Sequence, residues 1–120
     1  MSAMRAGVGR ADITPPVGIA AGGWGNQLHE VSTANDLELW ATVLVVEGAD
    51  GSRCALADLD LCLLDDRQAA RARTVIAQAT EVPVDRVAVG TTHNHAVPVT
   101  VELGGAWIRA GRELVAPYVE

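Results

Sequence analysis

The sequence predicts an α/β fold with a mixed sheet, in which an N-terminal β-hairpin is followed by a right-handed βαβ unit. Three observations predict it: two strand-forming segments joined by an Asp-Gly turn, an amphipathic helical segment after them, and a further strand-forming segment after the helix. The chain contains no Phe, so its core must come from Val, Leu, Ile and Ala. We expect these elements to form part of a larger α/β hydrolytic domain.

The hairpin accounts for the first half of the chain. Residues 7–14 are a short extended segment that stops at the pair Pro15–Pro16. Residues 37–47 are rich in strand-forming side chains, and residues 48–52 are a turn that contains Asp-Gly. Residues 53–61 are then predicted to return as the partner strand.

A helix and a strand complete the predicted βαβ unit. Asp65 can cap the helix, and Gln68 can close a capping box three residues later. Pro83 ends the helical pattern, and residues 86–92 are the next strand. The predicted inward face of the helix is an apolar stripe made of Ala69, Ala72, Val75, Ile76 and Ala79.

Charge and composition exclude some classes of function. The net charge is −6 with nine Arg and no Lys, so the chain lacks the basic footprint of a nucleic-acid-binding protein. No apolar run reaches the length of a membrane span. Residues 1–10 contain no apolar signal-peptide core, which predicts a cytoplasmic protein and leaves secretion open as the alternative.

The two cysteines are predicted to be buried free thiols. Cys54 and Cys62 lie eight residues apart on what reads as one extended segment. At about 3.3 Å per residue they would be roughly 26 Å apart, too far for a disulfide. This pattern favours a reducing compartment.

Polar side chains follow two neighbouring strands of the predicted sheet. Asp58 and Asp60 close the strand before the helix, and His93 and His95 close the strand after it. Ligands of open α/β sheets bind beyond the carboxyl ends of the strands. The sequence therefore predicts a site at this edge.

The segment Thr92-His93-Asn94-His95 carries the strongest chemical signal. Histidines at i and i+2 on extended backbone project to one face, so both imidazoles could address one metal ion or one substrate. The alternative is a pair of structural, hydrogen-bonded loop histidines. A catalytic zinc usually takes three protein ligands. The remaining histidine, His29, is not linked to the pair by its spacing, and we interpret it as an exposed loop residue. A complete zinc site would therefore need a carboxylate of this chain or ligands outside residues 1–120.

Two further groups are candidates for supporting roles. Asp58 and Asp60 alternate with apolar neighbours, which suggests a carboxylate that orients an imidazole, with a solvated strand end as the alternative. Gly23, Trp24 and Gly25 lie in a glycine-rich loop that could bring backbone close to a ligand, with Trp24 as an apolar wall; the alternative is a simple turn. No Cys–His arrangement stands out from the spacing.

Several motifs together resemble the neutral/alkaline, non-lysosomal ceramidase family. Residues 7–16 (GVGRADITPP) resemble the family's opening G-x-G-x-A-D-I-T-P-P, and residues 21–25 (AGGWG) are similar to its M-A-G-Y-G. Residues 36–44 match its D-x-L-x-A-R-A-L strand loosely, and residues 57–61 (ADLDL) are similar to V-S-x-D-L. Residues 92–98 (THNHAVP) stand where the family has T-H-T-H-S-G-P, and all five matches occur in family order.

The resemblance implies a function and a set of roles. It implies that His93 ligates a catalytic Zn²⁺ and that His95 contacts the substrate or transition state. It also implies that the other ligands, a histidine, a glutamate and a tyrosine, lie beyond residue 120, so that residues 1–120 are the N-terminal portion of a ceramidase-like catalytic domain and are inactive alone. The implied reaction is zinc-dependent hydrolysis of a ceramide-like N-acyl lipid to a fatty acid and a sphingoid base, a step of sphingolipid metabolism.

The sequence departs from the family around the histidines. Asn94, Ala96 and Val97 replace the family's Thr, Ser and Gly, and the β-branched Val97 excludes a positive φ. Two alternatives therefore stay open: a metal-dependent hydrolase of the same fold acting on a non-ceramide amide or ester, and a non-catalytic binding domain. The expected partner is a small-molecule or lipid amide, and no oligomeric state is predicted.

Overall fold

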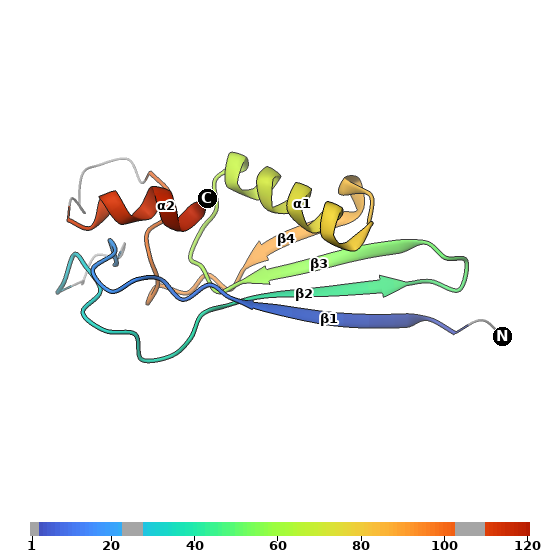
Figure 1. Ribbon diagram of the computed structural model, residues 1–120, viewed down its shortest axis with the longest axis horizontal. Coiled ribbons are helices and arrows are strands. Elements are labelled where there is room, and N and C mark those ends of the chain that lie inside the picture. Colours follow the sequence, from blue (N-terminus) through green and yellow to red (C-terminus); the bar gives the residue numbers. More distant parts are fainter. Residues whose placement is uncertain (1–2, 23–27, 103–109) are drawn as a thin grey trace.

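The computed structural model describes residues 3–22, 28–102 and 110–120. Its elements follow the chain in the order shown in Figure 1: β1 (Arg5–Asp12), β2 (Trp40–Glu47), β3 (Arg53–Leu59), α1 (Asp66–Thr80), the 3-10 turn η1 (Val84–Arg86), β4 (Val87–Thr91), the 3-10 turn η2 (Arg112–Leu114) and α2 (Val115–Val119).

The four strands form one mixed sheet in the order β1-β2-β3-β4. β1 pairs with β2 and β2 with β3 in antiparallel fashion, whereas β3 and β4 are parallel and are connected through α1. β3 and β4 both end on the side of the molecule where α2 lies (Figure 1). The predicted α/β class, the hairpin and the βαβ connection are confirmed.

The hairpin turn forms where the Asp-Gly pair predicted it. The Gly48 N–H donates to the Ser52 carbonyl at 2.8 Å, and the Asp50 carboxylate accepts from the Ser52 backbone N–H at 3.0 Å. Gly51 has a φ of +80°, a conformation that side chains with a Cβ rarely adopt. The turn therefore needs both the Asp side chain and the glycine that follows it.

All four predicted strands differ at their ends. β1 begins and ends two residues earlier than predicted, and β4 is one residue shorter at each end. β2 begins at Trp40, and β3 ends at Leu59 because the Leu61 N–H turns back to the Leu59 carbonyl at 2.7 Å. Cys62 therefore lies beyond β3, and Cys54, within it, is exposed. The prediction of two buried thiols on one extended segment was wrong, although both cysteines are free as expected.

Helix α1 is capped as predicted, but its inward face is shifted. The Gln68 N–H donates to the Asp65 carboxylate at 2.7 Å, and the Asp65 N–H donates to the Gln68 side-chain oxygen at 3.0 Å. Ile76 and Ala77 pack on the cluster of Ala55, Val82 and Val87, whereas Val75 is 54% exposed. Each residue is rotated by about 100° around the helix axis, so Val75 and Ala77 lie about 200° apart. Because Ala77 faces the core, Val75 faces outward.

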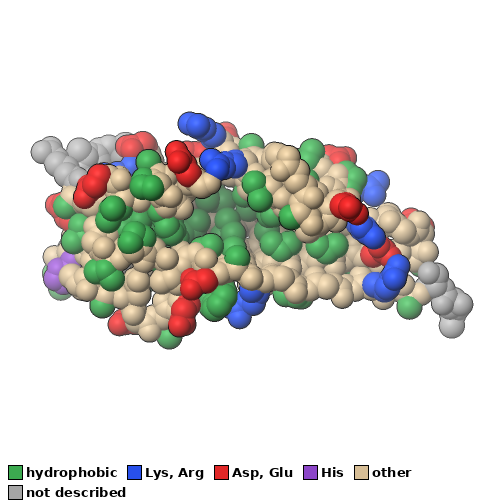
Figure 2. All heavy atoms as spheres, in the orientation of Figure 1, with side chains coloured by type: hydrophobic (Ala, Val, Ile, Leu, Met, Phe, Trp, Pro, Cys, Tyr) green, Lys and Arg blue, Asp and Glu red, His purple; other side chains and the backbone are tan. Residues whose placement is uncertain are grey.

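The two faces of the sheet differ in burial. Ala55 faces α1 and is 1% exposed, whereas its neighbour Leu56 points to the other face and is 51% exposed. Val8, in register with Leu44 and through it with Leu56, is 66% exposed. Figure 2 shows hydrophobic side chains at the surface between charged groups on the side in view. Among the described residues, nothing covers the face of the sheet that is turned away from α1.

The molecule is elongated, with extents of 57 × 27 × 23 Å and a radius of gyration of 16.5 Å. A compact domain of this length would have a radius of gyration of about 14 Å. None of the described helices is long and apolar enough to cross a membrane.

A second, smaller core lies beyond the carboxyl ends of β3 and β4, in what we call the loop lobe (residues 13–22, 28–39, 92–102 and 110–120). Ile19, Ala20 and Val115 are its buried centre. The Ala20 N–H donates to the Gly111 carbonyl and the Val99 N–H to the Ala20 carbonyl, each at 3.1 Å. A Cβ at Gly111 would come within 2.3 Å of the Gly18 carbonyl oxygen, so this close approach requires glycine.

Candidate metal site

The chain segments that follow β3 and β4 lie side by side. The Thr92 N–H donates to the Leu59 carbonyl at 3.0 Å, and the Asn94 N–H donates to the Leu61 carbonyl at 3.3 Å. The parallel pairing thus continues past both strands and brings Cys62 next to the two histidines. The two segments therefore meet at the edge of the sheet where the sequence predicted a site, with Cys62 and not the two aspartates beside the histidines.

The orientation of the His93 ring is set by the conformation of its backbone and by a contact with Cys62. Its φ is +56°, an uncommon value for a residue with a side chain, so the extended backbone on which the histidine pairing was predicted is not what forms. Its Nδ1 lies 3.1 Å from the Cys62 carbonyl oxygen. A carbonyl can only accept, so Nδ1 is the donor in this contact, and Nε2 is the ring nitrogen that remains outside it.

The His95 ring lies edge-on to the His93 ring, with centroids 4.9 Å apart and an interplanar angle of 85°. Both imidazoles are exposed, as a site open to a ligand requires. The two rings therefore approach one another as the sequence predicted, through a left-handed residue and not through strand geometry.

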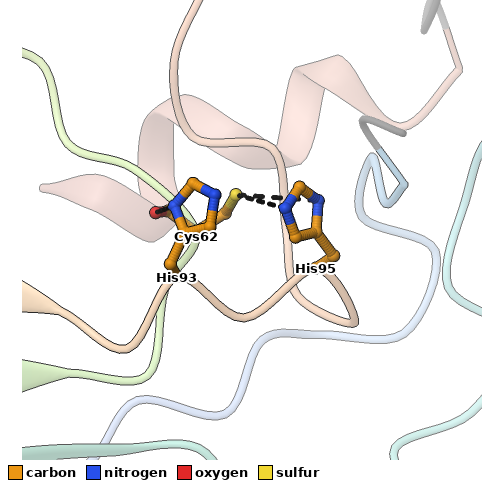
Figure 3. A group of neighbouring side chains, drawn as sticks. All are labelled: Cys62, His93 and His95. Carbon is orange, nitrogen blue, oxygen red and sulfur yellow. Dashed lines mark hydrogen bonds between the residues drawn. The ribbon is translucent and has the colours of Figure 1, made fainter. Parts of the chain in front are cut away.

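Cys62 joins the two histidines and was missed from the sequence. Its Sγ lies 3.9 Å from both ring nitrogens of His95, and Figure 3 shows the sulfur between the two rings. One donor atom from each of Cys62, His93 and His95 lies within 4.8 Å of the others. The signal that could have found Cys62 is topological: residues just after neighbouring parallel strands meet, whatever their separation in sequence.

This arrangement does not favour an activated cysteine nucleophile. Burial raises the pKa of the Cys62 thiol above its usual value. The thiolate and not the thiol is the nucleophile, so a raised pKa lowers the reactive fraction near neutral pH.

The donor set fits zinc. Thiolate sulfur and imidazole nitrogen are the ligands that Zn²⁺ prefers. In a tetrahedral site, bonds of about 2.3 Å to sulfur and about 2.05 Å to nitrogen place neighbouring donors roughly 3.3–3.6 Å apart. The separations of 3.9 Å and up to 4.8 Å found here exceed these values by distances that side-chain rotation can close. Cys62, His93 and His95 can therefore hold a metal ion.

The two aspartates have different surroundings. The Asp60 carboxylate accepts from the Trp40 backbone N–H at 2.9 Å, and the Asp60 N–H donates to the Trp40 carbonyl at 3.0 Å. Asp58 is exposed within β3, in register with Thr42 and Gly90. No hydrogen bond between the described residues links either carboxylate to an imidazole, and their role in orienting a histidine stays a prediction.

The remaining candidates do not join the cluster. Gly23, Trp24 and Gly25 lie outside the described residues, so their proposed contact with a ligand stays a prediction. His29 is exposed in the loop lobe, as predicted. The donor group described above does not include it.

The loop after the histidines is anchored in the loop lobe. The Gln68 side-chain amide donates to the Thr100 carbonyl at 2.8 Å, the Thr100 hydroxyl to the Leu63 carbonyl at 2.9 Å, and Arg112 to the Val99 carbonyl at 2.9 Å. Val97 is 3% exposed. Its side chain is therefore buried, which suits an apolar residue at this position.

Comparisons with known proteins agree with the fold. No family model matches the chain, and no curated protein sequence matches it. Among solved structures, neutral ceramidase from Pseudomonas aeruginosa is similar over 79% of this chain, with 28% identity and a TM-score of 0.61. The resemblance to neutral ceramidases is confirmed. A ceramidase complexed with C2 matches over the same share, with 26% identity and a TM-score of 0.64. The neutral-ceramidase-like chain spans only 16% and 15% of these two proteins.

Proposed function

We propose that this chain is the N-terminal portion of a zinc-dependent hydrolase that cleaves the amide bond of a ceramide-like N-acyl lipid. The single observation that carries the proposal is the group of Cys62, His93 and His95 at the carboxyl edge of β3 and β4, in a chain similar to two ceramidases. The products would be a fatty acid and a sphingoid base.

The shape of the chain supports a larger catalytic domain. Its matches span about one sixth of each ceramidase. The sheet face that carries Val8 and Leu56 exposes both of these apolar side chains and is uncovered by the described residues. Large apolar side chains exposed on one face in this way are often buried against another part of a protein. Residues 1–120 would then supply one wall of the active site.

The residues of this chain have distinct tasks in the proposed reaction. A bound zinc would supply Lewis acidity and a water activated near neutral pH. His93 would hold the ion through Nε2, because its Nδ1 is anchored to the Cys62 carbonyl. His95, exposed beside it, would donate a hydrogen bond to the scissile carbonyl oxygen or a proton to the departing nitrogen.

A different acyl substrate is the second candidate. Asn94, Ala96 and Val97 differ from the ceramidase pattern next to both histidines, and Val97 is buried. Because these substitutions lie next to the proposed substrate contact, we expect them to change substrate specificity and to leave metal binding intact. The substrate would then be another amide or an ester.

The test uses the protein that contains this chain together with the rest of the proposed domain. We expect one zinc per protein and release of fatty acid from N-acylsphingosine. His93→Ala should lower turnover by more than about 100-fold together with zinc content, since even the outer partners of ligands change affinity by about 10- to 100-fold. His29→Ala, which removes an exposed histidine outside the cluster, is the matched control.

Three outcomes separate the hypotheses. Turnover of simple N-acyl compounds or esters without turnover of N-acylsphingosine would support the second candidate. Zinc binding without hydrolysis of either class would indicate a non-catalytic domain. Full activity of His93→Ala would refute the proposal.

A further inference from the structure

We propose that Thr91 is a positioning residue for His93 and acts through the backbone carbonyl of Cys62. The inference rests on the proposed function, in which His93 holds the zinc ion, and it leaves the roles of His93 and His95 unchanged. It adds a residue that would touch neither the metal nor the substrate. The Thr91 hydroxyl would fix the carbonyl group that, in turn, decides which nitrogen of His93 carries the hydrogen.

The first link is the contact between the His93 ring and Cys62. Nδ1 of His93 lies 3.1 Å from the Cys62 carbonyl oxygen (Figure 3). In a neutral imidazole, the hydrogen bond made by one nitrogen sets the tautomer, and the other nitrogen is the one that can bind a metal. For His93 this contact leaves Nε2 available. The position of one carbonyl oxygen therefore determines how the ring is presented.

The second link is a hydrogen bond from the Thr91 hydroxyl to the same carbonyl oxygen, at 3.0 Å. A backbone carbonyl has two lone pairs, so it can accept from Thr91 and from His93 together. Thr91 is the last residue of β4, and its backbone lies in parallel register with Leu59. Its hydroxyl therefore connects the carbonyl to a part of the chain that the sheet keeps in place.

The position of Cys62 shows why such a link is needed. Cys62 lies beyond the end of β3, after the point where the Leu61 N–H turns back to the Leu59 carbonyl at 2.7 Å. Among the described residues, only the side chains of Thr91 and His93 donate to the Cys62 carbonyl. The His93 ring is exposed. Without Thr91, the carbonyl would be held only by the exposed ring that it is meant to orient.

The first measurement is the tautomer of His93 in the metal-free 120-residue chain. Long-range ¹H–¹⁵N correlation spectra report it at about pH 8.5, where an unperturbed imidazole is neutral. The His93 signals are assigned by their absence from His93→Gln. We expect the hydrogen on Nδ1 in the unsubstituted chain. Thr91→Val keeps the β-branched shape but lacks the hydroxyl, so we expect part of the hydrogen to move to Nε2.

Two variants are controls for this measurement. Thr91→Ser keeps a hydroxyl and should restore the form with the hydrogen on Nδ1. Thr92→Val makes the same substitution one residue along, at an exposed side chain without a hydrogen bond to another described residue, and should leave the spectrum unchanged. A purely structural role of Thr91 would lower stability without changing the tautomer. Circular dichroism of each variant checks that the fold is retained.

The second measurement is the zinc affinity of the protein that contains this chain, determined by competition with a chelator. Thr91→Val should weaken zinc binding by about tenfold, the lower end of the range for partners of a ligand, because Thr91 acts through the Cys62 carbonyl. Thr91→Ser and Thr92→Val should bind zinc as the unsubstituted protein does.

The outcomes separate this inference from the proposed function. An unchanged tautomer in Thr91→Val would overturn the inference, whatever the complete protein hydrolyses. A changed tautomer with unchanged zinc affinity would also overturn it, because the hydroxyl would then orient the ring without effect on the metal. Absence of zinc from the unsubstituted complete protein would refute the proposed function and the inference together, and no Thr91 variant is needed to see it.

Discussion

The sheet half of the molecule (β1–β4 with α1) and the loop lobe are stabilised in different ways. In the sheet half, regular backbone pairing joins consecutive elements, and one face packs under α1. In the loop lobe, single hydrogen bonds connect segments far apart in the chain, such as those that link Ala20 to Gly111 and Tyr118 to Ile13. The candidate metal site lies where the two regions meet.

This difference between the two regions explains why the candidate site lies at the carboxyl edge of the sheet. The ends of β3 and β4 are held in register by the parallel pairing behind them. The segments that leave them are free of strand geometry, which lets His93 adopt a left-handed conformation and face Cys62. Side chains held at a rigid edge but pointing away from the sheet are well suited to bind a ligand.

The largest effect is expected in the sheet half, where a pair of substitutions compares the buried face of the sheet with the uncovered one. Ala55→Asp places a carboxylate at a position that is 1% exposed under α1. Burial of an unpaired charge should cost more than about 3 kcal/mol of unfolding free energy and abolish cooperative unfolding. Denaturant titration of the 120-residue chain, followed by circular dichroism, measures this loss.

Leu56→Asp is the matched control, one residue along the same strand and on the uncovered face. We expect a change within about 0.5 kcal/mol, as for an exposed site. Equal losses for the two variants would mean that both faces are buried in solution, which would contradict the difference between the faces.

The same contrast explains what could be predicted from the sequence. The hairpin, the capped helix and the βαβ order follow from short-range patterns: the Asp-Gly turn, the Asp65–Gln68 capping box and alternating apolar residues. The inward position of Ala77 over Val75 depends on how the helix docks, which its own periodicity does not fix. Cys62 was missed because its neighbours His93 and His95 are about 30 residues away, and only the continued pairing past β3 and β4 brings them together.

The second prediction separates two roles of Asp60. If its task is to accept from the Trp40 N–H, Asp60→Ala should cost about 1–3 kcal/mol of stability, because that donor loses its partner. The zinc content of the protein that contains this chain should then be unchanged. A carboxylate that orients a histidine would give the opposite result, with a lower zinc content and little loss of stability.

Asp60→Asn is the conservative control, since its side-chain oxygen can still accept from Trp40. We expect it to recover most of the stability that the alanine variant loses. If the asparagine and alanine variants were equally destabilised, the charge of Asp60 and not its hydrogen bond would be what matters.

The third prediction concerns the contacts that join α1 to the loop lobe. Asp65→Ala removes the helix cap and should cost about 1 kcal/mol. Gln68→Ala removes the other half of the capping box and also the bond to the Thr100 carbonyl, so it should in addition increase hydrogen exchange in residues 97–100. Asp66→Ala, which lies in the same turn but is not the cap, is the control. Unchanged exchange in Gln68→Ala would show that the helix does not anchor the loop.

The smallest effect at neutral pH, and the one with a distinctive pH dependence, is expected in the loop lobe at Tyr118. Its hydroxyl donates to the Ile13 carbonyl at 2.6 Å, and burial, with a smaller contribution from the Asp12 carboxylate, raises its pKa to about 12. Tyr118→Phe should cost about 0.5–1 kcal/mol of unfolding free energy near pH 7, the usual net value of one hydrogen bond.

The pH dependence of stability gives a second test of the same contact. The tyrosine of the unfolded chain has a pKa near 10. The folded value is higher, so the contribution is present in full below about pH 10 and is lost as the pH rises toward about 12. Denaturant midpoints of the unsubstituted chain should therefore fall over that interval, and those of Tyr118→Phe should fall less. Parallel curves for the two proteins would mean that Tyr118 titrates as it does in the unfolded chain, and that α2 is not held against the segment after β1.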